Sequence, residues 1–244
     1  MESRSSKHEV AGLTWDQVGL RLAAGAAAIL PIGAGAKEHG LHMPMGTDEV
    51  FAAYFARALA ERFDALIWPT LAYGFYPAFV AYSGSVSLSN ATFQSAVAEI
   101  AGALIGFGAE RVLILNTGLS TIAPVDAAIS ASRDRNRVRH LKVFSGRRFE
   151  ETVGELKQQP YGTHADEIET SLMLAIAPGL VGMSRAEPCP FSPTGPAPGP
   201  LSPTDPSSPN YAPSGSFGDP TLASVEKGEC LLVAILDDLL EAAD

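Results

Sequence analysis

Residues 30–48 read Leu-Pro-Ile-Gly-Ala-Gly-Ala-Lys-Glu-His-Gly-Leu-His-Met-Pro-Met-Gly-Thr-Asp. An apolar run over 26–32 ends at Gly33 and Gly35, a pattern that predicts a buried strand opening into a tight turn. Four potential metal ligands follow within eleven residues: Glu38, His39, His42 and Asp48. Open α/β sheets place their sites in loops at the carboxyl ends of strands, so this loop is the first candidate for a site.

Two structural interpretations compete with a metal site in this loop. Glu38 and Asp48 can be solvated carboxylates, with the histidines bonded to a nearby helix end. Asp48 can also be a helix N-cap, because residues 50–63 carry apolar side chains at helical spacing. The loop sequence alone leaves these alternatives open.

Strands and helices alternate along the whole chain. The sequence predicts strands over 26–32, 65–71, 111–116 and 138–144, and helices over 15–27, 50–63, 92–106, 124–132, 172–176 and 224–240. Such alternation predicts an α/β fold with a mainly parallel sheet covered by helices on both faces. Right-handed crossovers bring the post-strand loops to one edge, so the 37–48, 73–79 and 116–121 loops are expected to converge there.

Composition excludes several classes of protein. The chain has 244 residues, 46% of them hydrophobic, and a formal net charge of −10, which argues against nucleic-acid binding and against a polybasic membrane anchor. The N-terminus lacks the apolar core of a signal peptide, and Cys189 and Cys230 form no zinc-binding pair. We therefore expect a soluble, cytoplasmic, globular protein.

We expect residues 1–244 to form a single domain with one irregular excursion. Residues 187–220 hold eleven of the eighteen prolines and are rich in serine and glycine, so they cannot form a helix or a central strand. This excursion is either a disordered surface segment or an ordered flap over a neighbouring site.

A second group of polar residues lies in the segment 162–171. His164, Glu167 and Ser171 have helical spacing, and Glu169 lies beside them at the predicted start of a helix. Carboxylates in a first helical turn often only complement the helix dipole, so this segment by itself is a weak signal.

Taken together, these motifs resemble the creatininase (creatinine amidohydrolase) family over nearly the whole chain. The resemblance rests on 30–33, His39-Gly40-x-His42-x-Pro44 with Asp48, Tyr73-Gly74, the strand ending at Asn116, His164-Ala165-x-Glu167-Ile168-Glu169-Thr170-Ser171, 217–220 and 226–228. It implies a three-layer α/β/α sandwich and a homo-oligomer, often a hexamer. It also implies hydrolysis of cyclic amides or formamides at a divalent metal centre. Because the family keeps 218–220 close to that centre, the resemblance further implies that 211–220 is ordered near the site.

This chain departs from the family pattern at three metal-binding positions. Lys37 stands where the family has a glutamate, Gly118 where it has a histidine, and Ser120 where it has a glutamate. A binuclear centre needs roughly three protein ligands per ion, and the remaining set cannot supply them. The tryptophans that stack on creatinine also have no counterpart, since the chain has only Trp15 and Trp68.

The leading hypothesis is therefore a metal-dependent hydrolase that cleaves a C–N bond of a small amide, lactam or formamide other than creatinine. One divalent ion, Zn, Mn or Fe, would be held by His39, Asp48 and Glu169, with Glu38 as a further ligand. Catalytic roles would fall to His164 or a nearby carboxylate, as proton shuttle, and to Lys37 and Glu167. The first alternative is a small-molecule-binding pseudoenzyme that holds no metal. The second is a metal-independent enzyme built around Lys37.

The position of Lys37 distinguishes two geometries. Carboxylates crowded in a cleft need a counter-charge, and an ammonium group can supply it where a metal ion is missing. We expect the Lys37 amine within salt-bridge reach of Asp48 or Glu169. In the rival geometry Lys37 turns to solvent, and Glu38 turns towards His39 and Asp48 as a substitute ligand.

Overall fold

A computed structural model describes residues 7–189 and 197–244. Four parallel strands form one sheet in the order β2-β1-β3-β4. The strands are β1 (Ala27–Ile32), β2 (Ala65–Ile67), β3 (Val112–Asn116) and β4 (Val138–Lys142). The register pairs Ile32 with Asn116, so β1 and β3 end side by side.

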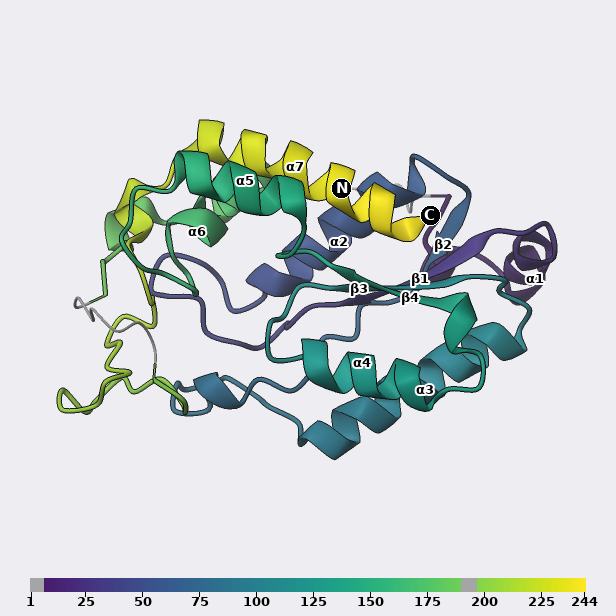
Figure 1. The fold of residues 1–244 in the computed structure, drawn as a ribbon, viewed down its shortest axis with the longest axis horizontal. Helices are drawn as coiled ribbons and strands as arrows, with labels where there is room; N and C mark the ends of the chain where they lie inside the picture. The colour runs from purple at the N-terminus through teal and green to yellow at the C-terminus, as the bar shows by residue number, and fades with distance from the viewer. Residues whose placement is uncertain (1–6, 190–196) are drawn as a thin grey trace.

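Seven α-helices are present in the described residues. They are α1 (Trp15–Ala23), α2 (Thr47–Ala60), α3 (Asn90–Gly106), α4 (Ile122–Ala131), α5 (Arg147–Leu156), α6 (Glu167–Ile176) and α7 (Val225–Ala243). Helices α2, α5, α6 and α7 cover one face of the sheet, and α3 and α4 cover the other (Figure 1). The predicted three-layer arrangement is confirmed. No helix in the described ranges is long and apolar enough to cross a bilayer.

Alternate residues of the central strands supply the two cores. Ile29 and Leu113 face the cluster that contains Phe51, Phe55 and Leu231, whereas Leu30 and Ile114 face the cluster that contains Phe93 and Val97. Both faces of β1 and β3 are therefore buried, which explains their uninterrupted apolar sequences. This rigid centre holds the loops that follow β1 and β3.

Three differences from the predicted elements affect the site or the core. Helix α5 was not predicted, although Phe149, Val153 and Leu156 lie at helical spacing and pack against the core. Helix α6 begins at Glu167 rather than at residue 172, because the Asp166 side chain caps it by accepting from the amides of Ile168 and Glu169. Strand β2 is shorter than 65–71, and Leu71 adds only an isolated bridge to Ile32.

The described part of the proline-rich segment packs against the loops at the carboxyl ends of the strands. The Leu201 amide donates to the carbonyl of Ala78 over 2.8 Å, and the Tyr82 hydroxyl donates to the carbonyl of Ala212 over 2.6 Å. The Phe217 amide donates to the carbonyl of His164 over 2.8 Å. The expected position of 211–220 near the site is thus confirmed, whereas 190–196 lie outside the described residues.

Candidate functional site

The turn after β1 brings the amino end of α2 against the strand. A Cβ atom on Gly33 would lie 2.3 Å from the backbone oxygen of Asp48 and 2.9 Å from the Cβ of Ala52. Only glycine permits so close an approach, and in this arrangement the Asp48 side chain contacts Lys37 and His39 of the loop. Gly46 occupies the N-cap position of α2, so Asp48 is not the N-cap.

The Asp48 carboxylate is the centre of a buried charged group. Lys37 Nζ lies 2.7 Å from its Oδ2, and His39 Nε2 lies 3.0 Å from its Oδ1. All three side chains are almost fully shielded from solvent. Burial raises the pKa of Asp48, but Lys37 and His39 outweigh it and hold that pKa below its usual range. Burial likewise lowers the pKa of Lys37, but Asp48 and Glu169 outweigh it and raise that pKa overall.

His164 organises the second half of the site. Its Nε2 lies 2.7 Å from Glu38 Oε1 and 2.9 Å from the Glu38 carbonyl, and its Nδ1 lies 3.5 Å from Glu169 Oε2. Ala165 adopts a left-handed φ of +45°, and its amide donates to Glu169 Oε2 over 2.6 Å. This strained turn makes His164 and Glu169 face each other. Burial opposes protonation of His164, but Glu38 and Glu169 raise its pKa to about 9.

The structure distinguishes the two geometries considered for Lys37. Its amine points inward at Asp48, as expected, and Glu38 does not face His39 and Asp48. Glu38 instead spans His164 and the Gly40 amide, which donates to Oε2 over 2.9 Å. Glu38 therefore orients His164, while the ammonium of Lys37 neutralises Asp48.

The histidines are oriented for a cation. His39 Nδ1–H donates to the Lys37 carbonyl over 2.9 Å, so Nε2, which shares a proton with Asp48 Oδ1 over 3.0 Å, is the nitrogen that would bind an ion on losing that proton. His164 Nε2 donates to Glu38 in the same way, so its Nδ1 would bind an ion in exchange for the proton that the raised pKa keeps on the ring. One ligand atom each from His39, His164 and Glu169 lies within 4.8 Å of the others. Ligating histidines bound through their second nitrogen to a carbonyl or carboxylate are the usual arrangement in metal sites, so these residues fit a divalent ion.

A cavity of about 210 Å³ opens onto this group. Lys37, His164 and Glu169 form its polar wall, and the loop after β3 forms another wall through residues 117–120. Phe79 lies between the two halves of the site, with its ring 4.8 Å from Lys37 Nζ and 4.4 Å from the His164 ring. The three loops expected to meet at this edge of the sheet do converge.

Glu167 and His42, two further residues of the motifs, lie outside the metal-ligand group. The buried Glu167 carboxylate accepts from the amides of Gln158 and Gln159 and pairs with Lys227 Nζ at 2.5 Å. His42 Nε2 lies 2.8 Å from Thr170 Oγ1. Both side chains therefore hold neighbouring segments of the chain together around the site.

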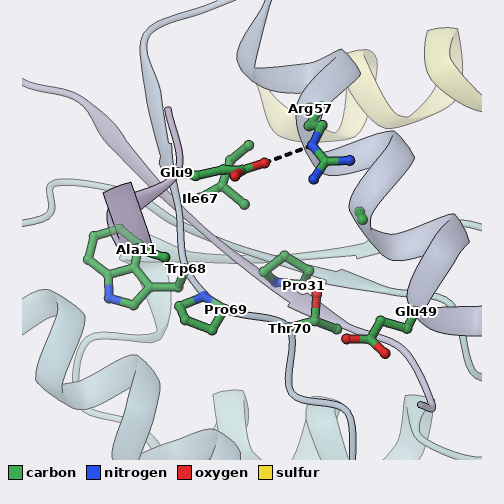
Figure 2. Close-up of a pocket in the computed structure, with 10 residues that line it drawn as sticks. Glu9, Ala11, Pro31, Glu49, Arg57, Ile67, Trp68, Pro69 and Thr70 are labelled. Carbon is green, nitrogen blue, oxygen red and sulfur yellow. Dashed lines mark hydrogen bonds and ion pairs between the residues drawn. The ribbon is translucent and has the colours of Figure 1, made fainter. Parts of the chain in front are cut away.

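A separate hollow of about 230 Å³ lies between α2 and the segment after β2 (Figure 2). Glu9 Oε1 pairs with Arg57 Nε across it at 2.7 Å, and Trp68, Pro69 and Pro31 line it. No member of the His39, His164 and Glu169 group lines this hollow, so it is distinct from the candidate site.

Known proteins with similar sequences identify the family of this chain. A family profile described as Creatininase: Creatinine amidohydrolase matches residues 11–243. The creatinine amidohydrolase of Pseudomonas putida is 31% identical over 253 residues, which cover 96% of this chain and 95% of that protein. The chain belongs to the creatininase family.

The relatives of this chain carry names of different activities. The mycofactocin precursor peptide peptidase of Mycobacterium ulcerans (strain Agy99) is 25% identical over 227 residues, covering 86% of this chain and 81% of that protein. A crystal structure of creatinine amidohydrolase superposes with a TM-score of 0.82 at 27% identity, over 98% of this chain and 97% of that one. This chain is thus a creatininase-family amidohydrolase.

Solved creatininases also indicate which metals the family binds. A manganese creatininase has a TM-score of 0.79 at 28% identity and covers 96% of both chains. A mutant creatininase of the Zn–Zn type has a TM-score of 0.81 at 28% identity, over 98% of this chain and 97% of that one. Creatininases of known structure therefore bind Mn or Zn. In this chain His39, His164 and Glu169 are the candidate metal ligands.

Several residues at this creatininase-family site were not found from the sequence. Leu201 and Gly199 of the proline-rich segment line the cavity, as does Tyr76, whose buried hydroxyl makes no hydrogen bond in the described residues. Gln159 is bonded to Asp166 at 2.6 Å and supports the start of α6. The expected convergence of the 73–79 loop was a signal for Tyr76, and the flap alternative for 187–220 was a signal for Leu201 and Gly199, whereas no signal pointed to Gln159.

Proposed function

We propose that this chain hydrolyses the C–N bond of a small amide, lactam or formamide other than creatinine, and that it uses one divalent metal. The observation that supports this most is the convergence of His39, His164 and Glu169, with both histidines anchored through their second nitrogens. When bound, the ion would supply a Lewis acid and lower the pKa of a water molecule. The remaining chemistry belongs to the side chains.

Lys37 takes the electrostatic role of a second cation. Its ammonium lies against Asp48 and lines the same cavity as Glu169. A substrate carbonyl in the cavity would develop negative charge as water adds to its carbon, and a fixed positive charge nearby stabilises that change. The raised pKa keeps Lys37 protonated, which disfavours the alternative in which it acts as a Schiff-base nucleophile.

Glu169 is the group we assign to proton transfer. Its Oε2 is held by the Ala165 amide and lies 3.5 Å from His164 Nδ1, so Oε2 would hold the ion, whereas Oε1 accepts no hydrogen bond within the described ranges. Oε1 takes a proton from the attacking water and delivers it to the nitrogen as the C–N bond breaks. The sequence had suggested His164 or a nearby carboxylate for this task. The carboxylate is favoured because His164 Nδ1 faces the metal-ligand group and its Nε2–H is committed to Glu38.

Three positions support a single ion over a binuclear centre. Lys37 offers an ammonium and Gly118 offers no ligand. A Cβ on Gly118 would lie 2.6 Å from Thr121 Oγ1 and 3.3 Å from the Tyr76 ring, so a larger side chain does not fit there. The Ser120 hydroxyl donates to the carbonyl of Phe75 over 2.7 Å.

Metal analysis of protein purified without chelators tests the proposal. We expect about one Mn, Zn or Fe per chain, stabilisation by added ion, and loss of both in His39→Ala. His140→Ala is the matched control, because this histidine lies outside the group and should retain the metal. Hydrolysis is then measured on a panel of lactams, formamides and N-acyl amino acids.

A pseudoenzyme is the second candidate, favoured by the Lys37–Asp48 pair because that pair neutralises the site without any metal. Protein that binds no ion, gains no stability from Mn²⁺, Zn²⁺ or Fe²⁺, and hydrolyses no member of the panel would support it and overturn the hydrolase. Full occupancy by one metal with turnover of any panel amide would exclude it.

A further inference from the structure

A second cavity of about 210 Å³ adjoins the one that contains Lys37. Leu119, Thr163 and Glu169 line both cavities, so these three residues form a shared wall. Leu119 and Thr163 are exposed, which places the outer part of the wall at the surface, while Glu169 lies at the inner end with the metal-ligand group. A molecule bound at Glu169 can therefore reach both chambers.

The lining of the second chamber is mainly apolar. Phe144, Phe149, Val153 and Ile168 come from the end of β4, from α5 and from the start of α6. Its polar groups are mostly committed: Asp166 accepts from the α6 amides and from Gln159. An aliphatic or aromatic side chain of a ligand would leave water here without displacing any protein hydrogen bond.

Lys157 is the one lining residue that carries a free charge. It follows the last residue of α5, is partly exposed, and forms no ion pair within the part of the chain that the structure describes. A half-buried ammonium at the edge of an apolar chamber is suited to a carboxylate. The chamber thus offers an apolar contact and a positive charge next to a hydrolytic site.

We propose that this second chamber is a substrate subsite for the side chain of an N-acyl amino acid with an apolar residue. The scissile amide would lie at Glu169, the apolar side chain would contact Phe149 and Val153, and the α-carboxylate would face Lys157. The inference rests on the proposed amide hydrolysis and names its substrate class. Hydrolysis would add water across the C–N bond to give the free carboxylic acid and the amino acid.

Binding of N-acetyl-L-phenylalanine and N-acetylglycine, compared by calorimetry, tests the subsite without turnover. Burial of an aromatic side chain is expected to tighten binding by about 10- to 100-fold over the glycine derivative. Val153→Asn should reduce that ratio by about tenfold, because it makes the chamber wall polar. Val233→Asn on the exposed side of α7 is the matched control and should leave the ratio unchanged.

Lys157→Met isolates the carboxylate contact, and circular dichroism establishes that each variant is folded. Lys157→Met should bind N-acetyl-L-phenylalanine more weakly but should bind the neutral N-acetyl-L-phenylalaninamide as the wild type does. Equal affinity for the glycine and phenylalanine derivatives, or a ratio unaffected by Val153→Asn, would overturn the subsite, as would failure of both to bind.

The subsite and the proposed hydrolysis can fail separately. A side-chain preference in binding with no acetate released in the presence of Mn²⁺ or Zn²⁺ would remove the hydrolase and keep the subsite. Hydrolysis of both derivatives with the same KM would keep the hydrolase and remove the subsite.

Discussion

Replacing Lys37 by methionine removes the ammonium that lies 2.7 Å from Asp48 and leaves a buried carboxylate without that partner. Removing one partner of a buried ion pair typically lowers the free energy of unfolding by about 3–5 kcal/mol. For a chain of this size each kcal/mol lowers Tm by roughly 2–4 °C, so the expected fall is about 6–20 °C in metal-free buffer.

The matched control is Lys142→Met. Lys142 Nζ lies 3.2 Å from Asp126 Oδ2, but both side chains are substantially exposed. Exposed pairs contribute about 1 kcal/mol or less, so this variant should melt within roughly 4 °C of the wild type. Thermal unfolding followed by circular dichroism in EDTA measures both variants under the same conditions.

A second measurement tests whether Lys37 replaces a metal ion. Without the ammonium, Asp48 and Glu169 present uncompensated negative charge, so the variant should gain more stability from Mn²⁺ than the wild type does. Binding at 100 times the dissociation constant corresponds to about 2.7 kcal/mol. The reasoning is refuted if Lys37→Met has the same Tm as the wild type in EDTA and if Mn²⁺ raises its Tm no more than that of the wild type.

Two further predictions concern the supports of the site. Burial lowers the pKa of His140 despite the opposing charge of Asp126, so the unfolded chain takes up the proton first as pH falls below about 6.5. Stability should decline from pH 7 towards pH 5, and His140→Asn should flatten that decline in urea unfolding, whereas an unchanged slope would contradict the assignment. Lys227→Met should cost about 3 kcal/mol, because it leaves the buried Glu167 carboxylate without its cation. Its metal content should match the wild type, and a loss of metal would show that Glu167 does belong to the centre.

The metal-ligand group shows how much of a site a local sequence pattern can predict. His39 and Asp48 lie nine residues apart, so the loop sequence could suggest that they act together. His164 and Glu169 were linked to them only through resemblance, because their contact with the loop spans more than a hundred residues. Helix α5 was missed although its apolar spacing is regular, and with it the second chamber was missed.

The sequence by itself determined the layers of this protein, since apolar strands buried on both faces and alternating with helices have few other ways to bury their surface. It also determined that a turn at Gly33 would present polar side chains at the end of β1. Only the tertiary structure decided which way those side chains point. Lys37 faces Asp48 and Glu38 faces His164 because buried charges must be paired, and the partners come from segments that meet only when the chain is folded.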